Sequence, residues 1–136
     1  MCLVGHALKM ARIHYDIDTF YHAMRVAAYV AENQLIPGKI MNDCIALAIM
    51  HDLWEDTKYP KEDIFLEEYF WNCLDLLTKE DKQNYIEYID LIKKYADKMP
   101  KAYWVKVADI KDHLCQTDTL TETLKKKYLN ALAHLL

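Results

Sequence analysis

The chain has 136 residues, enough for one domain with a buried core, and 17 Lys and Arg against 21 Asp and Glu give a formal charge of −4. This balance, without a large basic patch, excludes a protein that binds duplex nucleic acid through its charge. Because only two glycines and three prolines interrupt a composition rich in helix-forming residues, we expect an all-α fold with one compact domain over residues 1–136.

The first part of the chain predicts three helices. Apolar residues recur at helical spacing over residues 3–15 and 19–33, and Asp18 is the expected N-cap of the second segment. Residues 36–39 contain Pro and Gly and break this pattern. Asn42 is a suitable N-cap for a third, largely buried helix, which we expect to end near residue 53.

A loop over residues 57–59 and a fourth helix are expected next. Pro60 suits the first position of a helix, and residues 61–77 are amphipathic. A bend is expected near residues 69–71.

Three more segments complete a predicted bundle of about seven helices. Residues 78–81 resemble a capping box, which would open a long helix over residues 79–99. Pro100 restarts the chain for a helix over residues 100–114. Thr119 and Glu122 have the spacing of a second capping box, before the last helix.

The cysteines and apolar runs bear on the compartment. The cysteines lie far apart and form no Cys-x-x-Cys, so neither a zinc ribbon nor a redox pair is indicated and reduced thiols are expected. The longest apolar runs fall far short of the roughly 20 residues of a membrane span, and no signal-like segment opens the chain. We therefore expect a cytoplasmic protein without membrane association.

The most informative segment is residues 51–57, His-Asp-Leu-Trp-Glu-Asp-Thr, directly after the apolar run of residues 45–50. It places one imidazole and three carboxylates at the end of a helix that should be buried. Charged groups in such a place are costly unless they are paired or bind metal. The segment therefore predicts a site.

Two distant residues extend this site. His22 lies in an amphipathic segment rich in Ala and Val, where a polar ring needs a partner, and Asp109 interrupts the apolar residues 102–110. An ordinary role for Asp109, such as a salt bridge to Lys106 or a hydrogen bond from Trp or Tyr, remains an alternative. With His51 and Asp52 these residues supply two imidazoles and two carboxylates. Such donors suit Mn, Fe, Ni, Co or Zn, and the lack of Cys ligands argues against a closed structural zinc site.

The ordered set His22, His51-Asp52 and Asp109 resembles the HD-domain metal-dependent phosphohydrolases. The motifs at residues 51–57, 77–79 and 105–109 are similar to the hydrolase domain of RelA/SpoT-type alarmone (ppGpp) enzymes and their small stand-alone relatives. The resemblance extends from about residue 14 to residue 114. It implies a helical HD-domain bundle.

The resemblance also implies roles for individual residues. His22, His51, Asp52 and Asp109 would hold a divalent metal, with Mn²⁺ the first choice, and Glu55 and Asp56 would orient and deprotonate water. The implied reaction is 3′-pyrophosphate hydrolysis of a guanosine 3′-diphosphate alarmone, a small phosphorylated nucleotide, and a homodimer is left open. A solvated acidic helix end is the ordinary alternative for the acidic pair, although the helix dipole opposes it.

Some residues depart from the alarmone-hydrolase pattern. Residues 15–21 lack the longer basic loop that grips the guanine nucleotide in that family, and Ile110 and His113 stand where Arg and Asn are usual. Two alternatives therefore stay open: a nucleotidase or phosphatase for a monophosphate, and a non-catalytic nucleotide-sensing module.

Phosphate contacts beyond the metal would come from nearby cations. The candidates are Arg25, one helical turn from His22, Lys58, directly after the acidic pair, and Lys106. Glu55 lies four residues after His51, which puts its carboxylate beside the metal ligands if that helix continues. On this spacing Glu55 is the expected base.

Overall fold

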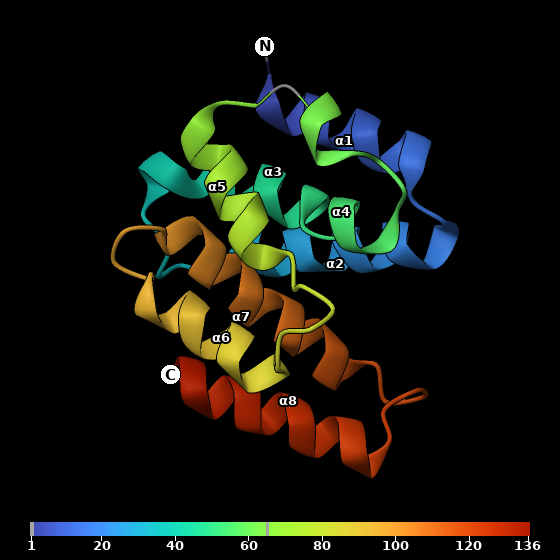
Figure 1. Ribbon diagram of the computed structural model, residues 1–136, viewed down its shortest axis with the longest axis vertical. Coiled ribbons are helices and arrows are strands. Elements are labelled where there is room, and N and C mark those ends of the chain that lie inside the picture. The colour runs from blue at the N-terminus through green and yellow to red at the C-terminus, as the bar shows by residue number, and fades with distance from the viewer. Residues whose placement is uncertain (1, 65) are drawn as a thin grey trace.

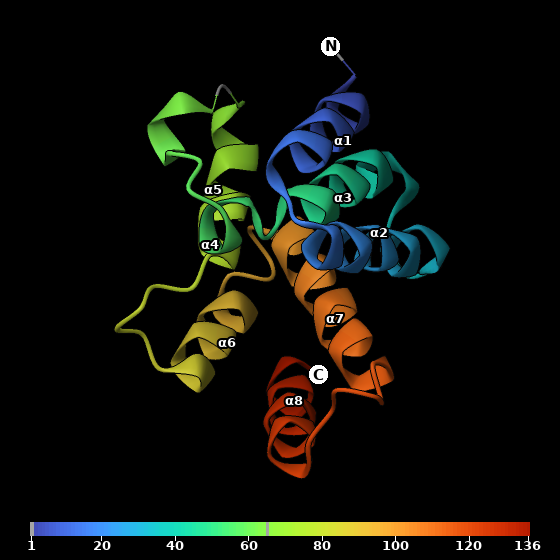
Figure 2. The ribbon, with the colours of Figure 1, turned by 90° about the vertical axis from the view of Figure 1, so that its right-hand side faces the viewer.

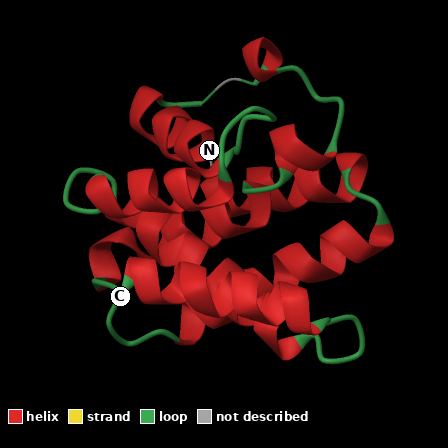
Figure 3. Cartoon of the chain, turned by 60° about the horizontal axis from the view of Figure 1, so that its bottom comes forward, coloured by secondary structure: helices red, strands yellow, loops and turns green. Residues whose placement is uncertain are grey.

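The structure, a computed structural model, describes residues 2–64 and 66–136, without the side chain of residue 63. This part of the chain is helical and has no strand, which confirms the all-α class (Figures 1 and 3). Between α3 (Gly38–Met50) and α5 (Glu68–Leu77) lie the single-turn helix α4 (Leu53–Asp56) and a 3₁₀ turn (Lys61–Asp63). The described residues form seven helices of ten residues or more: α1 (Leu3–His14), α2 (Ile17–Glu32), α3 (Gly38–Met50), α5 (Glu68–Leu77), α6 (Tyr85–Lys94), α7 (Pro100–Cys115) and α8 (Glu122–Leu135).

Helices α2, α3 and α7 form the centre of the bundle. Helix α3 packs against α1 and α2, and α7 contacts α2, α3, α5 and α8. Figure 2 shows α1, α3 and α2 in a row beside α7, with α8 at the far end. Leu47 on α3 and Val105 and Ile110 on α7 are fully buried. Each such side chain contributes roughly 1.5–3 kcal/mol through burial, so the helices that carry the candidate ligands also carry much of the core.

Side-chain caps set several helix starts, at positions other than those expected. The carboxylate of Asp16 caps α2 by accepting from the Thr19 N–H at 2.8 Å, while Asp18 lies within the first turn. There the negative charge of Asp18 interacts favourably with the positive end of the helix dipole. Helix α3 starts at Gly38, directly after Pro37 and before the expected cap Asn42.

The long helices expected over residues 61–77 and 79–99 are wrong in their first parts. The chain is extended at Ile64, and α5 starts only after Glu67, whose carboxylate accepts from the N–H groups of Tyr69 and Phe70. The expected bend near residues 69–71 lies inside the regular α5, and Phe65 lies outside the described residues.

Residues 78–83 form a loop because tertiary contacts replace the expected capping box. The Lys79 N–H donates to the Glu55 carboxylate at 2.7 Å, and Asn84 caps α6 instead. Helix α6 already ends at Lys94. Thr121 caps α8, two residues after the expected Thr119, whereas Pro100 begins α7 as predicted.

The four cysteines are free thiols, as expected: Cys44 and Cys73 are buried, and Cys2 and Cys115 are exposed. Among the described residues, no helix combines the length and apolar character needed to cross a membrane.

Candidate metal centre

Helix α3 delivers the His51-Asp52 doublet to the centre of the molecule. Residues 46–50 at its end are buried, and the chain then turns at Asp52 (φ −97°, ψ 4°) before α4 begins. Because the apolar end of α3 is held in the core, the doublet is fixed there as well. Only 3% of His51 and 9% of Asp52 is exposed.

The structure brings all four predicted ligands together, from α2, α7 and the end of α3. The Oδ1 atom of Asp109 lies 2.8 Å from His22 Nε2 and 3.3 Å from His51 Nε2. The Oδ2 atom of Asp52 lies 3.3 Å from His51 Nε2 and 3.5 Å from His22 Nε2. Two imidazole nitrogens and two carboxylates therefore face one point between helices that are distant in the sequence.

Hydrogen bonds at the Nδ1 atoms of His22 and His51 determine which ring nitrogen of each imidazole can bind a metal. The Nδ1 atom of His51 lies 2.6 Å from the Ala48 carbonyl oxygen, and the Nδ1 atom of His22 lies 2.7 Å from Asp112 Oδ2. Since both partners are acceptors, each Nδ1 carries the hydrogen. In the neutral ring each Nε2 then presents a lone pair toward the carboxylates. This is the donor set and outer support of a divalent metal site, so these residues fit the predicted ion.

Asp112 is a site residue that sequence reasoning missed. It is fully buried, and besides His22 it accepts from the Arg25 guanidinium through Oδ1 at 2.8 Å. Asp112 orients His22 and is itself held by Arg25. Its position three residues after Asp109, on the same helix face, is the sequence signal that could have found it.

The carboxylates of Asp52 and Asp109 favour a positive charge between the two imidazoles. Burial alone would lower the pKa of His51, but Asp52 and Asp109 raise it to about 9. Burial would raise the pKa of Asp109, yet the Lys106 ammonium and the neighbouring imidazoles hold it well below its usual range. The Lys106 Nζ lies 2.7 Å from Asp109 Oδ2, so the salt bridge considered as the alternative role of Asp109 is present on one oxygen, while the other oxygen faces the imidazoles.

Glu55 and Asp56 lie on α4, which is separate from α3. The helix of His51 does not continue to Glu55, so the expected one-turn relation is wrong; the turn at Asp52 intervenes. The Glu55 carboxylate accepts from the Lys79 N–H, and burial raises its pKa. Burial and the charges of Asp52 and Glu55 raise the pKa of the partly exposed Asp56 to about 6.

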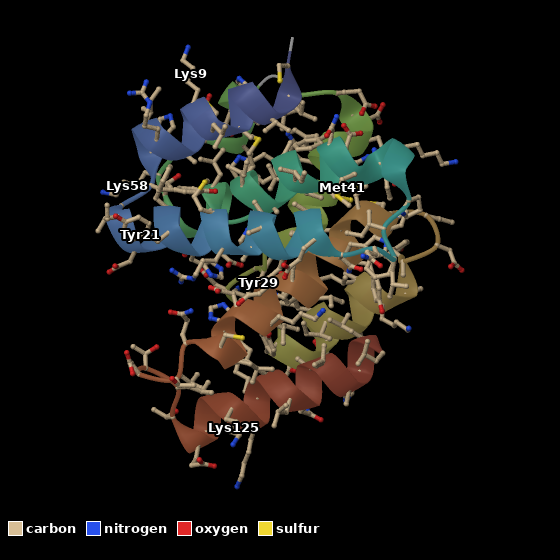
Figure 4. The ribbon with its side chains drawn as sticks, turned by 180° about the vertical axis from the view of Figure 1, so that it is seen from behind. Lys9, Tyr21, Tyr29, Met41, Lys58 and Lys125 are labelled. Carbon is tan, nitrogen blue, oxygen red and sulfur yellow. The ribbon has the colours of Figure 1, made fainter. Side chains whose placement is uncertain are left out.

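A cavity of about 580 Å³ opens on this centre. Its cations are Lys79, Lys106 and Lys127, and of these only Lys106 was predicted to contact substrate. Arg25 is tied to Asp112 beside the cavity, and Lys58 is exposed and does not line it; Figure 4 shows Lys58 at the outer edge of the molecule. The remaining lining residues are acidic, aromatic or other polar side chains: Asp18, Thr19, His22, Asp52, Glu55, Asp56, Asp81, Tyr85, Tyr88, Asp109, His113 and Tyr128.

Helix α8 closes one wall of the cavity with residues that sequence reasoning did not single out. The Lys127 Nζ lies 4.3 Å from the ring centroid of Tyr85, and Tyr128 stacks on His113 at 4.6 Å. The Tyr85 hydroxyl is buried and has no hydrogen-bond partner among the described residues.

In comparisons with known proteins, no protein-family model and no curated protein matches this chain.

Proposed function

We propose that this chain is a divalent-metal-dependent phosphohydrolase that acts on a phosphorylated nucleotide. The observation that carries the proposal is the convergence of His22, His51, Asp52 and Asp109 beside a cavity that Glu55 and Asp56 also line. A cation bound among these imidazole nitrogens and carboxylates would offset the cost of burying them together. An ion bound there would lower the pKa of a water molecule and neutralise phosphate charge.

The acidic pair supplies the proton chemistry. Glu55 is oriented by the Lys79 N–H, and its raised pKa makes it a stronger base than an ordinary carboxylate. In the proposed reaction, the oxygen of water forms a bond to phosphorus and Glu55 accepts the proton of that water. The bond from phosphorus to the leaving oxygen breaks, and this oxygen takes up a proton from solvent. Asp56 lies beside Glu55 on the same helix and orients the water.

The first substrate choice is a guanosine 3′-diphosphate alarmone, from which hydrolysis releases pyrophosphate by breaking the bond between phosphorus and the ribose O3′. This choice rests on the family resemblance. It is supported by Lys79 and Lys127, two cationic residues that line a cavity large enough for a small polar ligand.

A nucleoside monophosphate is the second choice, and a specific observation favours it. The α1–α2 side of the cavity contributes Asp18 and Thr19 instead of cations, and Arg25 is bound to Asp112. Fewer free cations favour a substrate with fewer phosphate charges. For either substrate we propose the cytoplasm as the location, consistent with four free thiols.

Turnover of a nucleotide panel by the metal-free protein with added Mn²⁺, Co²⁺ or Zn²⁺ tests the proposal. Pyrophosphate release from the 3′ position selects the alarmone, and orthophosphate release from monophosphates selects the second substrate. The test variant is His51→Asn, which removes a proposed ligand. The matched control is His134→Asn, which changes an exposed histidine. Tight nucleotide binding without turnover under every metal would instead indicate a sensing module and contradict the enzyme proposal.

A further inference from the structure

His113 brings a third imidazole to the candidate metal centre. It lies on α7, four residues after Asp109, and its Nε2 atom is 3.3 Å from Asp109 Oδ1. Its ring centroid is 4.8 Å from that of His22. The ligand atoms of His22, Asp109 and His113 all lie within 4.8 Å of one another, as do those of His22, His51 and Asp52.

With His113 included, three imidazoles face one carboxylate oxygen, Oδ1 of Asp109. The Nε2 atoms of His22, His51 and His113 lie 2.8, 3.3 and 3.3 Å from Asp109 Oδ1. A carboxylate oxygen offers about two lone pairs, so it cannot accept good hydrogen bonds from three ring nitrogens at once. At least one Nε2 therefore presents its own lone pair to the oxygen, an arrangement that a cation would stabilise.

Both groups of ligand atoms contain His22. Because one ring nitrogen binds one ion, the two groups describe two sides of a single site. We infer that His113 is a fifth protein ligand of the ion that His22, His51, Asp52 and Asp109 hold; this inference rests on the proposed function. Three imidazoles and two carboxylates favour Fe, Co, Ni or Zn over Mn more strongly than two of each.

The surroundings of His113 suit this role. Its ring is parallel to that of Tyr128, with an interplanar angle of 2° and a centroid distance of 4.6 Å, so α8 holds the ring in position. The side chain is 38% exposed and lies at the cavity side of the centre. A substitution there leaves the buried core intact, which makes the ligand role testable without unfolding the protein.

The experiment compares Co²⁺ and Mn²⁺ binding to the metal-free wild-type protein, His113→Asn and His134→Asn. His134 is the matched control because its Nδ1 also lies near a carboxylate, 2.7 Å from Asp90, at an exposed place far along the chain. Co²⁺ is followed by its visible absorption, which depends on the number and type of ligands, and Mn²⁺ by the signal of the free ion.

We expect the wild-type protein and His134→Asn to bind one Co²⁺ with the same spectrum. In His113→Asn the affinity for Co²⁺ should fall by about tenfold or more, the affinity for Mn²⁺ should fall less, and the spectrum should change. His113→Gln should behave like His113→Asn.

An unchanged Co²⁺ spectrum and affinity ratio in His113→Asn would overturn the fifth ligand and leave the proposed function intact, especially if KM for a nucleotide rose instead. Two Co²⁺ ions per wild-type chain would overturn the single site. Absence of binding by the wild-type protein would overturn both proposals.

Discussion

The two sides of the cavity are built differently. The side that carries the proposed metal ligands, called the ligand side below, comes from α2, α7 and the end of α3. There His51 and Asp109 are buried, and each of their ring nitrogens and carboxylate oxygens has a partner. The opposite wall comes from the one-turn helix α4, the loop over residues 78–84 and helices α6 and α8, and its acidic pair is only partly buried.

This difference separates what substitutions should do. A change on the ligand side disturbs buried charges, so it should alter metal binding and stability together. A change on the wall should alter turnover or substrate affinity and leave the fold intact.

The largest effect is expected from Asp109→Asn. It removes a ligand and leaves the buried Lys106 ammonium without its partner, which costs about 3–5 kcal/mol for a broken buried ion pair. Metal binding and turnover should be lost and Tm should fall. Adding Lys106→Met to this variant should recover much of the stability but no metal binding. If Asp109→Asn kept both its Tm and its metal, Asp109 would be neither a metal ligand nor a stabilising partner of Lys106.

Glu55→Gln should leave the metal in place while turnover falls by about 10²–10⁴-fold, the usual contribution of a positioned general base. The amide oxygen can still accept from the Lys79 N–H, so the local fold is retained. Metal content by elemental analysis and the single-turnover rate check this. Loss of the metal would make Glu55 a ligand, and near-native turnover would exclude it as the base.

Asp112→Asn tests the support behind His22. Removing the charge that holds the Nδ1 hydrogen should weaken metal affinity by about 10–100-fold, the usual range for such outer partners, while the wall and its acidic pair stay unchanged. Asp90→Asn, which alters the exposed pair with His134, is the control and should keep native affinity. Equal affinities in the two variants would remove the positioning role of Asp112.

Lys127→Ala should raise KM for a phosphorylated substrate by about tenfold, the equivalent of 1.4 kcal/mol, without a change in metal content. Lys58→Ala is the control because Lys58 lies outside the cavity lining and was predicted from sequence proximity alone. Steady-state kinetics at a fixed metal concentration separate the two. A larger KM effect at Lys58 than at Lys127 would contradict the described wall.

The smallest effect is the pH dependence of stability at Asp56. The folded protein binds the proton of the Asp56 carboxyl more tightly than the unfolded chain, since folding raises the pKa of this carboxyl from 3.8 to about 6. The stability that Asp56 contributes is therefore lost as the pH rises from about 4 through about 6. Asp56→Asn, measured with a chelator present, should have a Tm a few degrees above wild type at about pH 8 and nearly equal to it at about pH 4. A Tm difference that is the same at both pH values would contradict the pKa shift.

The convergence of the four proposed ligands could be predicted because apolar periodicity fixes helix faces. His22, His51, Asp52 and Asp109 each stand beside buried apolar residues, so their polar groups had to meet in the interior. Asp112 follows the same logic and was missed only because its spacing from Asp109 was not used.

The wall could not be predicted in the same way. The position of the loop before α6 beside the acidic pair involves a tertiary hydrogen bond from the Lys79 N–H to Glu55, which no local pattern reveals. Lys127 and Tyr128 reach the cavity only because α8 packs against α6 and α7. Arg25 has the right spacing for a substrate contact, yet its guanidinium donates to the buried carboxylate of Asp112 instead.

Anomalous diffraction at the absorption edge of Mn²⁺ or Co²⁺, from crystals grown with that ion, tests the metal centre most directly. We expect one strong peak in contact with the Nε2 atoms of His22 and His51 and with the carboxylates of Asp52 and Asp109. Absence of a peak there, with the imidazoles still hydrogen-bonded to the carboxylates at saturating metal, would contradict it.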